Sequence, residues 1–152
     1  MTLETLIPPE RVFHDLRAAD KPRLLQELAR RAGAALGVPA GDIAAALATR
    51  EALGSTGVGA GIAVPHAQLP QLDATAGFLA RLERPVDYAS VDGRPVDLLF
   101  LLIGPPAARA EHLAALAAAT RRLRDPAIAD ALRSAPGAEA LRVSFLAVPN
   151  NK

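Results

Sequence analysis

The sequence has 152 residues, a formal net charge of +1 at pH 7, no cysteine, and a hydrophobic fraction of 51% to which aromatic residues contribute little. This length fits one domain with its own core, the near-neutral charge argues against nucleic-acid binding, and the lack of cysteine excludes disulfides, thiolate metal sites and a cysteine nucleophile. Because the chain begins without a signal sequence and no apolar run is long enough to span a bilayer, we expect a soluble, cytoplasmic protein without membrane insertion.

The N-terminal third predicts one strand followed by two helices. Residues 12–16 form the strand, and Asp20 is the expected cap of a helix that Gly37 ends. A second helix is predicted over about residues 39–53. Gly54 follows it, at the position where a left-handed helix cap is expected.

The middle of the chain predicts the remaining strands. Residues 54–66 read GSTGVGAGIAVPH and hold four glycines within eight positions, so the backbone there turns sharply or lies close to another group. Short strands are predicted over residues 62–64 and 76–82, and residues 85–91 are predicted to be a connection. Residues 96–103 read VDLLFLLI, which is typical of a central strand buried on both faces.

The C-terminal third predicts helices, over about residues 108–123, then to about residue 132, and a short one near Gly137. The apolar segment 143–148 has no evident role. The order of strands and helices indicates an α/β domain, a mixed sheet flanked by helices, formed by residues 1–152 as a single unit.

The three histidines are the candidate chemical groups. His14 lies in the first predicted strand, where an ordinary strand side chain is the simpler interpretation. His66 follows a short strand and a glycine-rich loop, where α/β proteins place their sites, although a histidine that caps a turn fits the position equally well. His112 lies near the start of a helix, where anions are favoured, and a buried, hydrogen-bonded histidine is its alternative.

Two histidines beside a glycine-rich loop suggest a phosphohistidine site. A neutral imidazole nitrogen is nucleophilic near pH 7, and phosphoryl transfer depends on donors placed around the phosphoryl oxygens. His112, Arg50, Ser55 and Thr56 are the available donors. We therefore predict that the rings of His66 and His112 face each other across one shallow pocket.

Other interpretations of the glycine-rich loop fail on its sequence. A Walker A loop needs a lysine after its last glycine, and a dinucleotide-binding loop needs the strand before the glycines rather than after them. Zinc binding lacks a close-spaced ligand pair, and neither Ser55 nor Ser90 lies in the setting of a hydrolase nucleophile. We expect neither a metal nor a cofactor.

The motif REALGSTG at residues 50–57, continued by GIAVPH at residues 61–66, resembles the fructose/mannitol class of IIA domains of the bacterial phosphoenolpyruvate-dependent phosphotransferase system. Within this class the nitrogen-regulatory IIA proteins are the nearest. The likeness extends over residues 3–135, with further matches in LIPP at 6–9, DGRPVDLLF at 92–100 and EHL at 111–113. It implies a type 2 IIA domain whose mixed sheet has about five strands.

The resemblance also implies a role for each site residue. His66 would accept the phosphoryl group on its ε nitrogen from a histidine-containing phosphocarrier protein, which makes the chain a phosphotransferase with a phosphohistidine intermediate. His112 and Arg50 would bind the phosphoryl oxygens. Ser55 and Thr56 match the hydroxyl pair of the loop, with capping as the alternative to phosphoryl binding.

The same resemblance leaves the downstream step open. A chain without a membrane segment or second domain favours a regulatory IIA protein of the nitrogen or potassium type, acting on transporters or sensor kinases. The alternatives are a sugar-specific IIA component that passes phosphate to a IIB domain, a binding module that is no longer phosphorylated, and a sensor that binds an anion between Arg50 and His112. Ala60 and Gln68 replace a frequent asparagine and a frequent basic residue of the family; losing that basic residue near His66 is expected to weaken donor docking.

Overall fold

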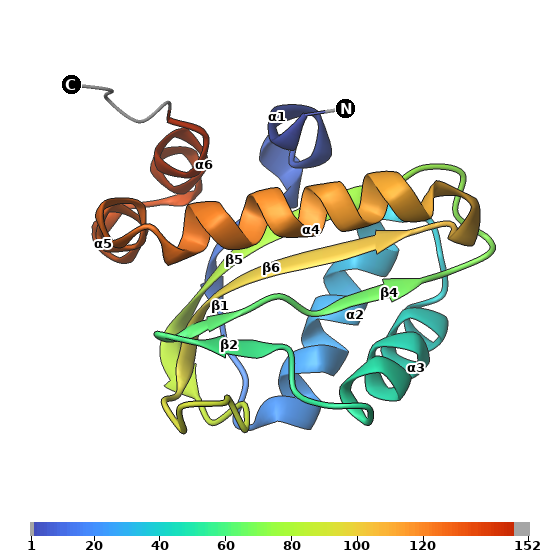
Figure 1. Ribbon diagram of the computed structural model, residues 1–152, viewed down its shortest axis with the longest axis horizontal. Coiled ribbons are helices and arrows are strands. Elements are labelled where there is room, and N and C mark those ends of the chain that lie inside the picture. The colour runs from blue at the N-terminus through green and yellow to red at the C-terminus, as the bar shows by residue number, and fades with distance from the viewer. Residues whose placement is uncertain (1, 148–152) are drawn as a thin grey trace.

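The computed structural model describes residues 2–147, which form a sheet with helices on both faces (Figure 1). In chain order the elements are α1 (Leu3–Leu6), η1 (Pro9–Arg11), β1 (Val12–Leu16), α2 (Lys21–Leu36), α3 (Ala40–Glu51), β2 (Gly57–Gly59), β3 (Ile62–Ala63), β4 (His66–Gln68), β5 (Ala76–Val86), β6 (Val96–Gly104), η2 (Pro106–Ala108), α4 (Arg109–Arg124), α5 (Pro126–Ser134) and α6 (Ala138–Leu146). The predicted α/β class is confirmed.

The sheet is mixed, as predicted. Five strands follow one path in the order β1-β5-β6-β3-β2, and the sixth strand, β4, pairs with β6 off this path. The pairs β1–β5, β3–β6 and β4–β6 are parallel, whereas β5–β6 and β2–β3 are antiparallel. β6 therefore has neighbours along both edges and forms the centre of the sheet.

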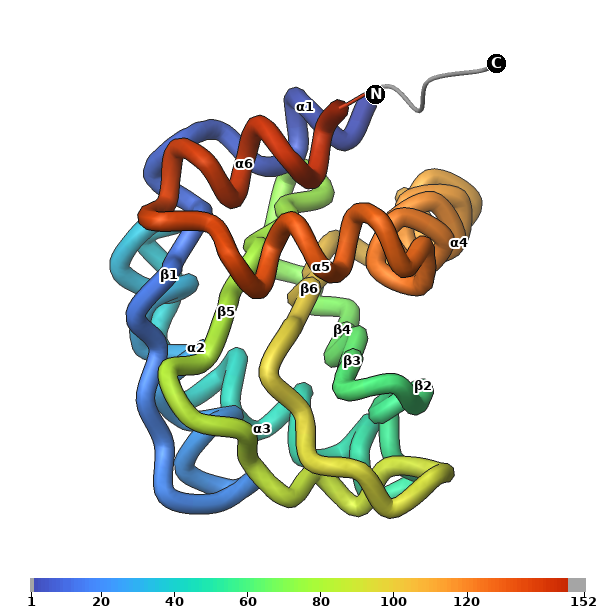
Figure 2. The backbone as a smooth tube through the Cα atoms, turned by 90° about the vertical axis from the view of Figure 1, so that its left-hand side faces the viewer, coloured from blue at the N-terminus to red at the C-terminus, as the bar shows by residue number. Residues whose placement is uncertain are grey.

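Strand β6 divides its side chains between two cores. Leu99, Leu101 and Ile103 pack with α2 and α3, and the alternate residues Leu98 and Phe100 pack with α1, α4, α5 and α6. Because successive residues of a strand point to opposite faces, an uninterrupted apolar run is what this central position requires. Figure 2 shows the two layers of helices with the sheet between them.

The start and end of α2 follow the predicted signals. The Asp20 carboxylate accepts a hydrogen bond from the backbone N–H of Arg23 at 2.9 Å, and Gly37 ends the helix in the left-handed conformation with φ of 70°. The prediction for Gly54 after α3 was wrong, because its φ is 145° and Ala52, the C-cap that follows Glu51, has helical dihedral angles. The backbone N–H groups of Leu53 and Gly54 bond three residues back, so a tightened turn replaces the left-handed cap.

Two segments that were predicted as loops are strands. β5 continues through Pro85 to Val86, because a register shift between Arg81 and Val86 accommodates the proline and lets Val86 pair with Val96. The glycine-rich segment contains β2, which forms a hairpin with β3 through Ala60 and Gly61. Both of these residues have positive φ, 58° and 80°, as in the hairpin turns that favour Asn-Gly.

The C-terminal helices match the prediction, and α6 takes in most of the apolar segment whose role was left open. Residues 143–146 belong to α6, where Phe145 is buried, and Val148 lies outside the described residues. Among the helices described, none is both long and apolar enough to cross a membrane.

Candidate functional site

The sheet topology brings His66 and His112 together. His66 is the first residue of β4 and pairs with Leu102 near the carboxyl end of β6. The chain leaves β6 at Gly104 and enters α4, whose first turn carries His112. The ring centroids lie 5.7 Å apart with 61° between the ring planes. The predicted meeting of the two rings is confirmed, and the shallow pocket between them stays a prediction.

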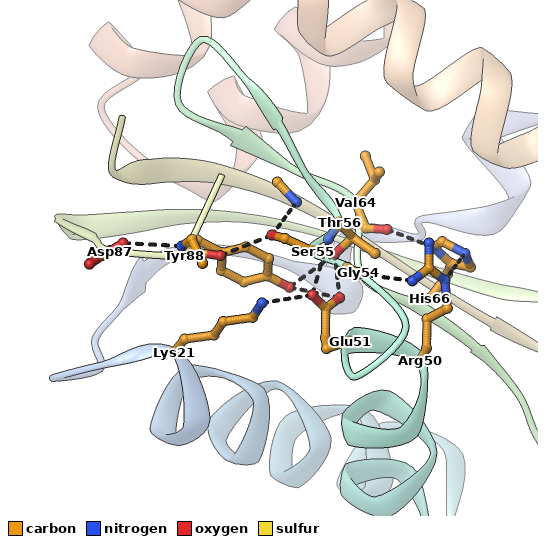
Figure 3. A network of polar contacts seen from close by, with 12 residues as sticks. Lys21, Arg50, Glu51, Gly54, Ser55, Thr56, Val64, His66, Asp87 and Tyr88 are labelled. Carbon is orange, nitrogen blue, oxygen red and sulfur yellow. Dashed lines mark hydrogen bonds and ion pairs between the residues drawn. The ribbon is translucent and has the colours of Figure 1, made fainter. Parts of the chain in front are cut away.

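Each ring nitrogen of His66 has a partner that can act only as an acceptor or only as a donor (Figure 3). Nδ1 lies 2.8 Å from the carbonyl oxygen of Val64, and Nε of Arg50 donates to Nε2 at 3.2 Å. A carbonyl oxygen can only accept and a guanidinium can only donate. The hydrogen therefore sits on Nδ1, and Nε2 carries the lone pair.

The surroundings of His66 keep its ring neutral. Burial lowers the pKa of His66 below the ordinary value of 6.5; the Val64 carbonyl and the Glu51 carboxylate oppose this effect, and the charge of Arg50 adds to it. A neutral imidazole with its lone pair on Nε2 is a nucleophile at pH 7.

Arg50 links the ring to the loop after α3. Its guanidinium donates from Nη1 to the carbonyl oxygen of Gly54 at 2.9 Å while Nε reaches His66. The side chain belongs to the last turn of α3. One cation is thus held beside the nucleophilic nitrogen by two hydrogen bonds.

His112 is held differently. Its side chain is buried, with the residue only 3% exposed, and Nδ1 has no hydrogen-bond partner among residues 2–147. Burial lowers the pKa of His112, and the nearby His66 and Arg109 lower it further. The ring lies in the first turn of the sixteen-residue helix α4, where the helix dipole favours negative charge. This end of the site therefore suits an anion.

The hydroxyl groups of Ser55 and Thr56 are engaged away from His66. Ser55 Oγ donates to the carbonyl of Tyr88 at 2.9 Å and accepts from the N–H of Gly57 at 3.1 Å. Thr56 is buried, and its hydroxyl contacts the Glu51 carboxylate and lies 3.1 Å from the Tyr88 hydroxyl. The geometry fits the alternative that both residues stabilise the turn.

Glu51 is the residue that sequence reasoning missed. Its carboxylate receives hydrogen bonds or an ion pair from Lys21 Nζ at 2.9 Å, the Thr56 N–H at 3.0 Å and the Tyr88 hydroxyl at 3.3 Å, besides the Thr56 hydroxyl. Burial would raise the pKa of Glu51, but the hydrogen bonds from Thr56 and Lys21 outweigh it and the pKa is lowered. Its place next to Arg50 in the motif was the available signal.

His14 does not join the other two histidines. It is exposed on β1 and lines a surface cavity with Arg81, Asp97 and Arg133. Within residues 2–147, no group of three or more histidine, aspartate or glutamate side chains is arranged to bind a metal ion.

Known proteins resemble this chain over nearly its whole length. The family model described as "Phosphoenolpyruvate-dependent sugar phosphotransferase system, EIIA 2" matches residues 5–146. The nitrogen regulatory protein of Bradyrhizobium diazoefficiens is 45% identical over 98% of this chain and 97% of its own length. That of Pseudomonas aeruginosa is 39% identical over 99% of this chain and 98% of its own.

A solved structure of a nitrogen regulatory protein has the same fold as this chain. The crystal structure of nitrogen regulatory protein IIA-Ntr from Neisseria meningitidis superposes with a TM-score of 0.89 at 29% identity, over 94% of this chain and 98% of that one. The resemblance drawn from the motif is confirmed: this chain belongs to the EIIA type 2 family of the phosphoenolpyruvate-dependent sugar phosphotransferase system, beside its nitrogen regulatory proteins.

Proposed function

We propose that His66 accepts a phosphoryl group on Nε2 from a histidine-containing phosphocarrier protein, and that the chain is a regulatory IIA protein of the nitrogen or potassium type. The observation that carries the proposal is the state of the ring: Val64 holds the hydrogen on Nδ1, and Arg50 lies at the lone pair of Nε2. A nucleophile with a fixed tautomer needs no proton removed before it attacks.

The transfer step is a direct displacement. The Nε2 lone pair forms a bond to phosphorus while the bond between phosphorus and the donor's ring nitrogen breaks, and the donor nitrogen keeps that electron pair. His66 retains the hydrogen on Nδ1, so the phosphorylated ring is positively charged. The Val64 carbonyl, which already accepts that hydrogen at 2.8 Å, stabilises this charge.

Arg50 and His112 would bind the phosphoryl oxygens. In the free protein the Nε–H of Arg50 occupies the lone pair of Nε2, so the guanidinium has to shift as the group arrives and can then donate to its oxygens. The His112 ring lies 5.7 Å from the His66 ring, measured between centroids, and its ring N–H can donate to the same oxygens. Together they supply the charge stabilisation on which phosphoryl transfer depends.

The regulatory assignment is supported by the relatives. The relatives at 45% and 39% identity are nitrogen regulatory proteins and match almost end to end. This match favours residues 1–152 as one EIIA type 2 domain. We propose that it acts in the cytoplasm on transporters or sensor kinases. Passage of phosphate to a IIB domain is the alternative. Gln68 lies two residues after His66 on β4, hence on the same face, and the lack of a basic side chain there is expected to weaken docking of the donor.

Intact mass tests the proposal. The protein and His66→Ala are each incubated with phosphoenolpyruvate, enzyme I and phosphocarrier. We expect the unaltered protein to gain one acid-labile phosphoryl group and His66→Ala to gain none, because no other ring nitrogen has this arrangement. Equal gain by both proteins would place the acceptor elsewhere, and no gain by either would favour a binding module that is not phosphorylated.

A further inference from the structure

We propose that Glu51 is a positioning residue for phosphoryl acceptance: its carboxylate fixes the loop 54–56, and this loop in turn holds both the His66 ring and Arg50. The inference rests on the proposed function, and it assigns the buried polar cluster of Lys21, Glu51, Thr56 and Tyr88 to that site (Figure 3).

The first step is the anchoring of the loop. The Glu51 side chain is only 6% exposed, and its two oxygens receive donors from separate parts of the chain: the start of α2, the loop after α3 and the connection after β5. Two of these donors, the backbone N–H and the hydroxyl, belong to Thr56. Thr56 is thereby held by both its main chain and its side chain.

The second step carries this anchoring to the histidine. The carbonyl of Thr56 accepts the N–H of Val64 at 3.0 Å, and the carbonyl of Val64 accepts the Nδ1 hydrogen of His66 at 2.8 Å. Two hydrogen bonds and one residue therefore separate the anchored loop from the ring. A displacement of Thr56 would shift the carbonyl that selects the His66 tautomer.

A parallel contact carries the anchoring to the arginine. The carbonyl of Gly54, two residues before Thr56, accepts from Nη1 of Arg50. The same loop thus positions the group that holds the tautomer and the cation at Nε2. Loosening the loop would disturb both nitrogens of His66 at once.

The cluster requires a hydrogen-bond acceptor at the position of Glu51. Lys21 Nζ and the Thr56 N–H can only donate, and both reach Oε1 of Glu51, whereas the hydroxyls of Thr56 and Tyr88 approach Oε2. Lys21 also lies with Nζ 4.3 Å from the centre of the Tyr88 ring, which fixes the cation beside the carboxylate. Glu51→Ala therefore leaves the Lys21 ammonium and the Thr56 N–H without their acceptor, whereas the oxygen of a glutamine could still receive both.

The test measures the His66 ring before any phosphate is added. Nitrogen-15 chemical shifts of the imidazole report the tautomer, and initial phosphorylation rates report its consequence. In Glu51→Ala we expect a mixture of tautomers in place of the Nδ1–H form, with a rate reduced about tenfold because the nucleophile is misdirected. The matched control is Glu27→Ala, which removes a carboxylate bonded to Arg30 and Arg31 on α2; it should leave both readouts unchanged.

A second variant keeps the test valid if the first variant does not fold. Glu51→Asp keeps the charge but is too short to reach Thr56 and Lys21 together, so a smaller tautomer shift in the same direction is expected. Unchanged tautomer and rate in folded Glu51→Ala, or in Glu51→Asp should the first variant not fold, would overturn the proposal. If the unaltered protein takes up no phosphate, the proposed function fails, while the tautomer shift still decides whether Glu51 positions the ring.

Discussion

The two sides of the site hold their histidines in contrasting ways. On the sheet side, each ring nitrogen of His66 has a partner, and one of these partners, Val64, is tied through Thr56 to the buried Glu51 carboxylate. On the helix side, the Nδ1 of His112 is buried without a partner, and α4 begins without a side-chain cap. One ring is fixed in tautomer, whereas the other can carry its hydrogen on either nitrogen.

This contrast matches two different tasks. A nucleophile gains from a fixed tautomer, because its lone pair must point at the incoming phosphorus. A group that responds to arriving charge gains from freedom, because it can present an N–H or take up a proton as the phosphoryl oxygens approach. We therefore expect transfer to require the His66 ring itself, and its rate to depend on both the contacts that orient this ring and the His112 ring on the helix side.

The largest effect expected within this contrast is that of His112→Ala. The variant should still gain one phosphoryl group, but about 10²–10³-fold more slowly, as for other preorganised donors to a developing anion, or lose the group faster afterwards. Rapid-quench sampling of intact mass would measure both rates. His14→Ala, which removes the exposed histidine of β1, is the matched control; a His112→Ala rate within a factor of about two of the control would contradict the division of tasks.

A smaller effect is expected for Arg50→Lys, which keeps the charge but not the fork of donors. An ammonium group at this position cannot serve both His66 and Gly54 as the guanidinium does. Loss of one charge-assisted hydrogen bond should slow phosphorylation about tenfold. Arg30→Lys, on the exposed face of α2, provides the comparison; equal rates for the two variants would show that Arg50 does not hold the nucleophile.

The central features of the fold were accessible from the sequence because they depend on local patterns. The run 96–103 could only be a strand buried on both faces, and Asp20 and Gly37 carried clear helix start and stop signals. The meeting of His66 with His112 could also be predicted, because His66 precedes the long strand in the sequence and His112 lies on the helix that follows this strand. The stretch 57–68, where glycines and a proline obscure alternation, concealed β2 and β4.

The part of the site that sequence reasoning missed depends on tertiary packing. Glu51 stood in the motif beside Arg50, but its partners Lys21 and Tyr88 come from 30 and 37 residues away in the chain. No periodicity links such positions; the packing of α2 on α3 and the path of the chain after β5 bring them together. The frequent asparagine of the family at position 60 has a local explanation. This position lies in the β2–β3 turn with φ of 58°, a conformation that favours asparagine, and Ala60 adopts it in this chain.

The smallest expected effect is on stability and concerns both rings. Burial lowers the pKa of both His66 and His112 below 6.5. The charge of Arg50 lowers the pKa of His66 further and the Glu51 carboxylate raises it, while Arg109 lowers the pKa of His112 further. Between these lowered values and 6.5 the unfolded chain binds more protons than the folded one, so stability rises with pH. The contribution is fully present above pH 6.5 and is lost as the pH falls through the folded-state values.

Urea unfolding at pH 7.5 and pH 5.5 would measure this loss, in a range where unfolded-state carboxyl groups stay ionised. The midpoint of the unaltered protein should fall at the lower pH, and the double variant His66→Gln/His112→Gln should show a smaller fall, because it has no buried imidazole to protonate. His14→Gln is the matched control for the loss of a histidine. An equal pH dependence in the double variant and the unaltered protein would mean that neither ring is held neutral by the fold, and the contrast between the two sides of the site would then concern orientation alone.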